Sequence, residues 1–69
     1  MNGFIEYTDD VAGRRTIIAV SLISLITENT SGKAVLFLKD NVNRPLTAVE
    51  TYDEIRTRLD ACIREANSI

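Results

Sequence analysis

The 69-residue chain has no histidine, no tryptophan and a single cysteine, Cys62. A lone thiol excludes a disulfide within the chain, and without histidine a structural zinc site has too few ligands. The same shortage removes the usual activated nucleophiles, in which histidine deprotonates a serine or cysteine. The chain also lacks the glycine-rich loop that cradles phosphates in nucleotide-binding proteins. We therefore expect a non-catalytic protein with neither a metal nor a cofactor.

Long apolar runs and excess positive charge are absent too. The longest apolar-rich segment, 16–26, has 11 residues and contains two serines, whereas a membrane-spanning helix needs about 20 apolar residues. The first residues carry acids rather than the basic start of a secretion signal. Eight basic and ten acidic side chains give a net charge of −2, which disfavours nucleic-acid binding. We expect a cytoplasmic protein without membrane insertion.

The length of the chain allows one small domain, residues 1–69. A domain of this size buries only about 60% of the surface that its unfolded chain exposes. Chains so short commonly gain stability from disulfides, a metal or another subunit. Because the first two are excluded, we expect a homo-oligomer.

β-branched and aromatic residues dominate the first part of the chain, and turn-forming residues separate them. This pattern predicts strands at about 4–9, 14–20 and 23–28. The segment 16–26 also has apolar residues at helical spacing, so a helix is the alternative there. Its β-branched residues and internal serines favour two strands instead, joined at Ser21-Leu22 by a bend or a single helical turn.

The second part contains the clearest strand and the clearest helix. Apolar side chains occupy both faces of a strand at 33–39, and a turn at 40–45 leads to a last strand at 46–50. Thr51 and Glu54 have the spacing of a capping box before a helix at about 52–66. This helix has an apolar stripe, and we interpret the opposite side, with the pairs Glu54–Arg58 and Asp60–Arg64, as a solvated face.

These elements predict an α+β fold, a small antiparallel sheet of four to five strands with one C-terminal amphipathic helix. A single helix covers one face of such a sheet, so the other apolar face needs a different cover. A curled, barrel-like sheet would bury it within one chain. We favour a second subunit instead, with an interface formed by Ala34, Leu36, Leu38 and Ile23.

Arginines near strand ends are the best candidates for ligand binding. Arginine binds phosphate or carboxylate through two parallel hydrogen bonds, and tyrosine stacks beside such a ligand. The candidate ligand-binding residues are Arg14, Arg15, Arg44, Tyr7 and Tyr52. The simpler interpretation of these arginines is charge that keeps strand edges from aggregating. We interpret Cys62 as a buried apolar residue, and Asp9-Asp10 as part of a turn.

The order of four segments resembles a known family. FIEYTD, RTIIAVSLISLITEN, GKAVLFLKD and LTAVETYDEIRTRL resemble the FlbD-type flagellar proteins and similar small phage proteins. The resemblance covers roughly residues 3–60. It implies a strand-rich fold that ends in a helix, and a role in motility or in a phage.

The expected function is therefore that of a small, oligomeric, non-catalytic interaction or accessory protein. Its partners would be further copies of itself and either another protein or a small anionic ligand. The alternative is a phage-type sequestering protein that binds a nucleotide-like signal molecule between subunits.

Overall fold

The computed structural model describes residues 3–67, and within them the chain forms five strands, one short 3-10 helix and one α-helix. In chain order these are β1 (Phe4–Thr8), β2 (Arg15–Ala19), η1 (Val20–Leu22), β3 (Ile23–Glu28), β4 (Lys33–Leu38), β5 (Asn41–Thr51) and α1 (Tyr52–Asn67). The α+β class is as expected. Residues 1–2 and 68–69 of the expected domain lie outside the described residues.

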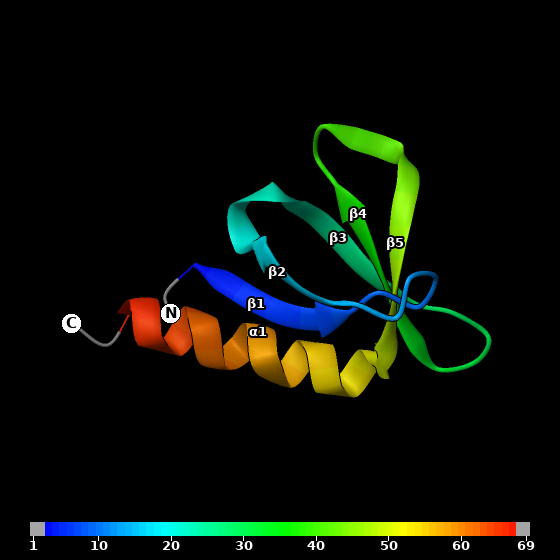
Figure 1. The fold of residues 1–69 in the computed structure, drawn as a ribbon. Coiled ribbons are helices and arrows are strands. Elements are labelled where there is room, and N and C mark those ends of the chain that lie inside the picture. The colour runs from blue at the N-terminus through cyan, green and yellow to red at the C-terminus, as the bar shows by residue number, and fades with distance from the viewer. Residues whose placement is uncertain (1–2, 68–69) are drawn as a thin grey trace.

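The strands form two small sheets, which corrects the prediction of one sheet with four to five strands. β1 and β2 form an antiparallel hairpin, and β3, β4 and β5 form a separate antiparallel sheet in that order. The two sheets touch through an isolated bridge between Asp9 and Ala48, where Asp10 N–H also donates to Thr47 O at 2.9 Å. Figure 1 shows the sheets fanning apart above α1.

The turn predicted at 40–45 is wrong for most of its length. The turn itself is confined to Lys39-Asp40, and β5 starts at Asn41. Pro45 is compatible with this strand because β5 lies at the edge of its sheet and its pairing with β4 is irregular between Asn41 and Leu46, where proline is tolerated. The pairing of β4 with β5 shifts register twice. Such bulges bend a strand, and the bent β5 reaches from β4 to β1.

Local signals place the other elements close to their expected positions. β3 has the expected bounds, and the bend expected at Ser21-Leu22 is the 3-10 helix η1. Thr51 caps α1, because its Oγ1 accepts a hydrogen bond from Glu54 N–H at 3.2 Å. Acids in the first turn and Arg64 in the last also suit the helix dipole.

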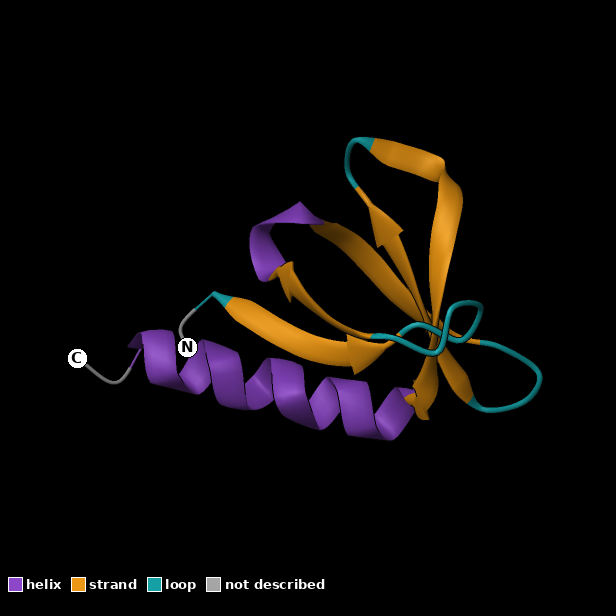
Figure 2. Ribbon diagram, viewed as in Figure 1, coloured by secondary structure: helices purple, strands orange, loops and turns teal. Residues whose placement is uncertain are grey.

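The core lies between α1 and the inner faces of both sheets (Figure 2). Its largest fully buried side chains are Leu36 of β4 and Ile55 of α1. The other buried members are Ile5, Tyr7, Ile18, Ala34, Ala48 and Cys62. The apolar face of β4 that carries Ala34 and Leu36 is therefore covered within one chain. Several large apolar residues lie outside this core and are exposed, as expected for a chain too short to bury all of its apolar surface.

Candidate functional site

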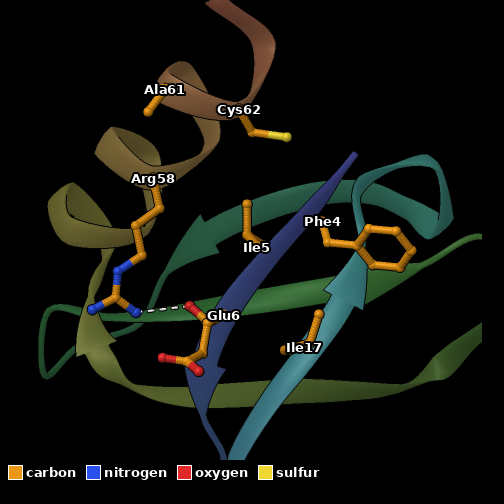
Figure 3. Close-up of a pocket in the computed structure, with 7 residues that line it drawn as sticks. All are labelled: Phe4, Ile5, Glu6, Ile17, Arg58, Ala61 and Cys62. Carbon is orange, nitrogen blue, oxygen red and sulfur yellow. Dashed lines mark hydrogen bonds between the residues drawn. The ribbon is translucent and has the colours of Figure 1, made fainter. Parts of the chain in front are cut away.

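A groove opens along one side of α1, between the helix and β1. It has a volume of about 400 Å³ and is lined by Phe4, Ile5, Glu6, Ile17, Arg58, Ala61 and Cys62. Figure 3 shows that the β1 and β2 residues form one wall, and that the helix residues form the other. We call this the β1 groove.

The backbone of β1 faces this groove with one of its two edges. Gly3 and Asp9, at the two ends of the strand, each form a 2.8 Å backbone hydrogen bond with the β2 side of the hairpin. In an antiparallel pair, successive residues alternate between bonding toward the partner strand and pointing away from it. The backbone groups of Phe4, Glu6 and Thr8 therefore point away from β2, toward α1 and β5.

Side chains cover part of this edge. The Arg58 guanidinium donates from Nη1 to the backbone oxygen of Glu6 at 2.7 Å, the bond drawn in Figure 3. The Thr8 N–H donates to the Glu50 carboxylate at 2.8 Å. Just before β1, the N–H of Gly3 donates to the Cys62 sulfur at 3.2 Å. These contacts tie β1 to α1 and β5 although no strand pairs with this edge over Phe4–Thr8.

The rest of the edge is open. Among the described residues, nothing bonds to the N–H of Glu6 or to either backbone group of Phe4. Unpaired backbone groups at a sheet edge form a template for another extended chain. The open groups lie consecutively along the β1 groove, so they can pair with a single added strand.

Apolar side chains flank these open groups. Phe4 and Ile17 project from the outer face of the hairpin, and they are 43% and 52% exposed. Of the two charged residues in the groove, Arg58 uses only its Nη1 for bonds within the described residues, so Nη2 and Nε are available to an acceptor. The exposed Glu6 side chain shares the outer face of the hairpin with Phe4 and Ile17. The groove thus combines a backbone template, an apolar wall and a charged donor.

Glu50 contacts Arg58 of the groove, and its carboxyl group has a perturbed pKa. Burial alone would raise the pKa of its carboxyl group. Hydrogen bonds from the N–H and hydroxyl of Thr8, together with the charge of Arg58, outweigh burial, so the pKa of Glu50 is lower than its usual value. The carboxylate therefore remains charged and forms an ion pair of 3.4 Å with Arg58.

The residues expected to bind a small anion do not form one site within the chain. Tyr7 is buried in the core, where desolvation and the nearby Asp9 raise its pKa. Arg14 and Arg15 are exposed beside the β1–β2 turn, whereas Arg44 lies in the first part of β5, near its turn with β4. Figure 1 shows these two turns at separate places in the fold. Tyr52 is half-buried at the start of α1.

The expected interface residues are also divided between inside and outside. Ala34 and Leu36 are fully buried in the core, so they offer no surface to a second subunit, and we reassign them to the core. Leu38 and Ile23 are partly buried at the border of that core. The alternation of apolar residues along β4 identified two apolar faces, but not which of them the helix covers.

The residues interpreted as structural have structural contacts. Cys62 is buried, with its sulfur accepting the bond from Gly3. Asp9 accepts a hydrogen bond from Val11 N–H within its turn, and Asp10 forms an ion pair of 2.9 Å with Lys33. In the described part of the chain, no group of three or more potential ligands could hold a metal ion, and no helix is long and apolar enough to cross a membrane.

Arg58 is the residue of this site that the sequence pattern misassigned. We expected it to pair with Glu54 on a solvated face, but no such ion pair exists among the described residues. Its guanidinium instead reaches β1, 52 positions away in the sequence, and Glu50. The available signal was Glu50 itself, an acid at the end of a strand eight residues before Arg58 and therefore close to the helix start.

Comparisons with known proteins do not identify a relative. No family model, no curated protein and no solved structure matches this chain. The resemblance to flagellar and phage proteins therefore stays a prediction from the sequence.

Proposed function

We propose that this protein is a non-catalytic interaction protein, and that it binds an extended segment of a partner protein in the β1 groove. The observation that carries the proposal is the open edge at Phe4 and Glu6 beside an apolar wall. Main-chain hydrogen bonds to a sheet edge give affinity for any extended chain, and side-chain pockets beside the edge give specificity. A role in motility or in a phage rests on the sequence resemblance alone.

The groove defines the chemistry of the segment it would accept. A strand beside Phe4 and Glu6 needs free backbone N–H and C=O groups, so proline is excluded at its central position. One of its side chains would pack on Phe4 and Ile17, which favours an apolar residue. An oxygen acceptor would face the free nitrogens of Arg58, because a guanidinium binds such oxygens with directional hydrogen bonds.

The alternative, capture of a nucleotide-like anion, has less support. It depends on Arg14, Arg15 and Arg44 acting together, and these residues lie near two separate turns of one chain. Binding phosphate tightly at a protein surface needs several converging donors. We therefore place the site in the β1 groove.

A proline substitution tests the proposal directly. A phage-displayed library of random peptides is selected on the full chain, and the affinity of the selected peptides is measured by calorimetry. Glu6→Pro removes the open N–H but no bond to β2, because Glu6 points away from that strand. We expect Glu6→Pro to weaken peptide binding about tenfold or more, which corresponds to at least about 1.4 kcal/mol.

Two matched variants separate the backbone from other effects. Glu6→Ala removes the same side chain but keeps the N–H, and it should retain most of the affinity. Ala19→Pro places proline on the other strand of the hairpin, where φ is already −70° and the N–H points away from β1. It should also retain binding. If selection yields no binder, or if Glu6→Pro binds as well as Glu6→Ala, the proposal is wrong.

A further inference from the structure

The opposite side of α1 has a second groove, which the proposed function does not use. It has a volume of about 390 Å³ and lies between α1 and β3 with η1 at one end. Its apolar lining comes mainly from Val20, Ile23 and Leu25 on the strand side, and from Leu59 and Ile63 on the helix side. We call this the β3 groove.

Much of this apolar surface is uncovered. Leu25 is 49% and Ile63 is 45% exposed, and both line the groove. β3 is also an edge strand of its sheet. Contiguous apolar surface of this kind on a small domain marks an interaction site. The question is which partner fits it.

Charges on the rim of the groove point to a second copy of the chain. Arg56 and Asp60 lie one turn apart on α1, both exposed and both lining the β3 groove. Among the described residues, neither of them forms an ion pair. A twofold axis between them would place Arg56 of each copy against Asp60 of the other. The rim is thus self-complementary, because the positive charge of each copy would meet the negative charge of the other.

The spacing of the helix residues supports the same arrangement. Tyr52, Arg56, Leu59 and Ile63 follow one another at intervals of four, three and four. This is the spacing of side chains that form the seam between two packed helices. In an antiparallel pair of α1 helices, the apolar members of the seam would cover each other and Leu25 would pack at the border.

We propose that two copies of the chain form a symmetric dimer through the β3 groove, with antiparallel α1 helices and reciprocal Arg56–Asp60 pairs. This arrangement differs from the interface expected from the sequence, and it keeps only Ile23 of the four residues named there. It leaves the β1 groove on the far side of the helix open, so each copy retains its peptide site.

Charge reversal gives a test that controls for misfolding. In Arg56→Asp, positions 56 and 60 are both negative, and in Asp60→Arg both are positive. Each variant alone would bring like charges together across the twofold axis, which is strongly unfavourable. Mixed in equal amounts, the two variants would match at both contacts. We expect dimerisation of each variant alone to weaken about tenfold or more, and the mixture to form a heterodimer.

The masses are measured by native mass spectrometry and by sedimentation over a dilution series. The wild-type chain of 7.7 kDa should have twice that mass at high concentration. Arg64→Asp is the matched control, because it reverses an exposed charge on the same helix outside the β3 groove, and it should dimerise normally. Circular dichroism checks that each single variant is folded, and heterodimer formation on mixing checks it independently.

Any of three results would overturn the proposal. The first is a wild type that stays a monomer at every concentration, and the second is single reversals that dimerise as well as the wild type. The third is a mixture of the two variants that forms no heterodimer. Because Arg56 and Asp60 are exposed, the fold of one chain does not depend on them, and loss of the dimer would report on the interface.

Discussion

The two sides of α1 are held in different ways. On the β1 side, Arg58 bonds to the backbone of Glu6, and Cys62 accepts the N–H of Gly3. On the β3 side, the described residues contain no hydrogen bond or ion pair between α1 and β3, and only apolar contacts remain. Hydrogen bonds fix a position, whereas apolar contacts depend mainly on the area that is buried. The β1 side therefore fixes the position of the helix by directional contacts, whereas the β3 side depends on buried apolar area.

Because of this difference, the two grooves would recognise their partners in different ways. A peptide in the β1 groove meets fixed backbone groups and a positioned guanidinium, so recognition there depends on geometry. A partner in the β3 groove meets a broad apolar surface with two charges, so recognition there depends on shape and charge symmetry. Substitutions that affect both sides of α1, one side or neither should then differ clearly in their effects on stability, peptide binding and dimerisation.

The largest effect is expected for Ile55→Ala, because this core residue belongs to α1, the helix that forms a wall of both grooves. Ile55 is fully buried, and shortening such a side chain leaves a cavity. The free energy of unfolding should fall by about 2–5 kcal/mol. Because a chain this small has little stability to lose, peptide binding and dimerisation should fail together. Urea unfolding followed by circular dichroism measures the loss.

Ile63→Ala is the matched control on the same helix. Ile63 is 45% exposed in the single chain, so its truncation should cost the monomer less than about 1 kcal/mol while weakening the dimer. The comparison must be made at equal protein concentration, since a dimer's apparent stability depends on it. If the two substitutions lowered the monomer's free energy of unfolding by equal amounts, α1 would not be packed as described.

An intermediate effect is expected on the anchored side, from Glu50→Gln. Glu50 accepts the N–H and hydroxyl of Thr8 at 2.8 and 2.9 Å, and it contacts Arg58. Removing its charge weakens all three contacts, and the free energy of unfolding at neutral pH should fall by about 1–3 kcal/mol. The dimer should be unaffected, because none of these residues lines the β3 groove.

The stability difference between the wild type and Glu50→Gln should also depend on pH. The pKa of Glu50 in the folded chain lies below its unfolded value of about 4.3, so its stabilising effect is present above that value. The effect is lost as the pH falls through the lower, folded pKa. The stability difference between wild type and Glu50→Gln should therefore shrink steadily below about pH 4.3. Urea unfolding at a series of pH values measures it, and a difference that stays constant would contradict the role of the carboxylate.

The sequence predicted those parts of the fold that depend on neighbouring residues. Thr51 and Glu54 located the start of α1, and the turn formers around Asn29 located the end of β3. By contrast, the residues at 40–45 are turn formers, yet five of these six positions lie in β5. At a sheet edge, proline and bulges cost little, so the long-range pairing with β4 overrides the local preference.

The candidate site was predicted less well, for a related reason. Arg58 has local neighbours that suggest a surface ion pair, and its actual partners come from β1 and the end of β5. The periodicity of α1 identified an apolar stripe, but not that a groove lies on either side of it. Which strand edge meets a helix depends on how two sheets diverge, and no local pattern encodes that divergence.

The smallest effects are expected outside both grooves. Arg14, Arg15 and Arg44 are exposed, and none of them lines the β1 or β3 groove. Replacing all three by alanine should change the free energy of unfolding by no more than about 0.5 kcal/mol for each residue. Peptide binding and dimerisation should be unchanged, because long-range effects of surface charges are screened at physiological salt.

The triple variant also decides between the proposed function and nucleotide capture. Calorimetry with a panel of mononucleotides and dinucleotides should give no heat of binding for the wild type or for the triple variant. Nucleotide binding by the wild type that the triple variant loses would mean that the arginines of two separate turns converge between subunits. That outcome would require an assembly other than the dimer through the β3 groove, because none of the three arginines lines that groove.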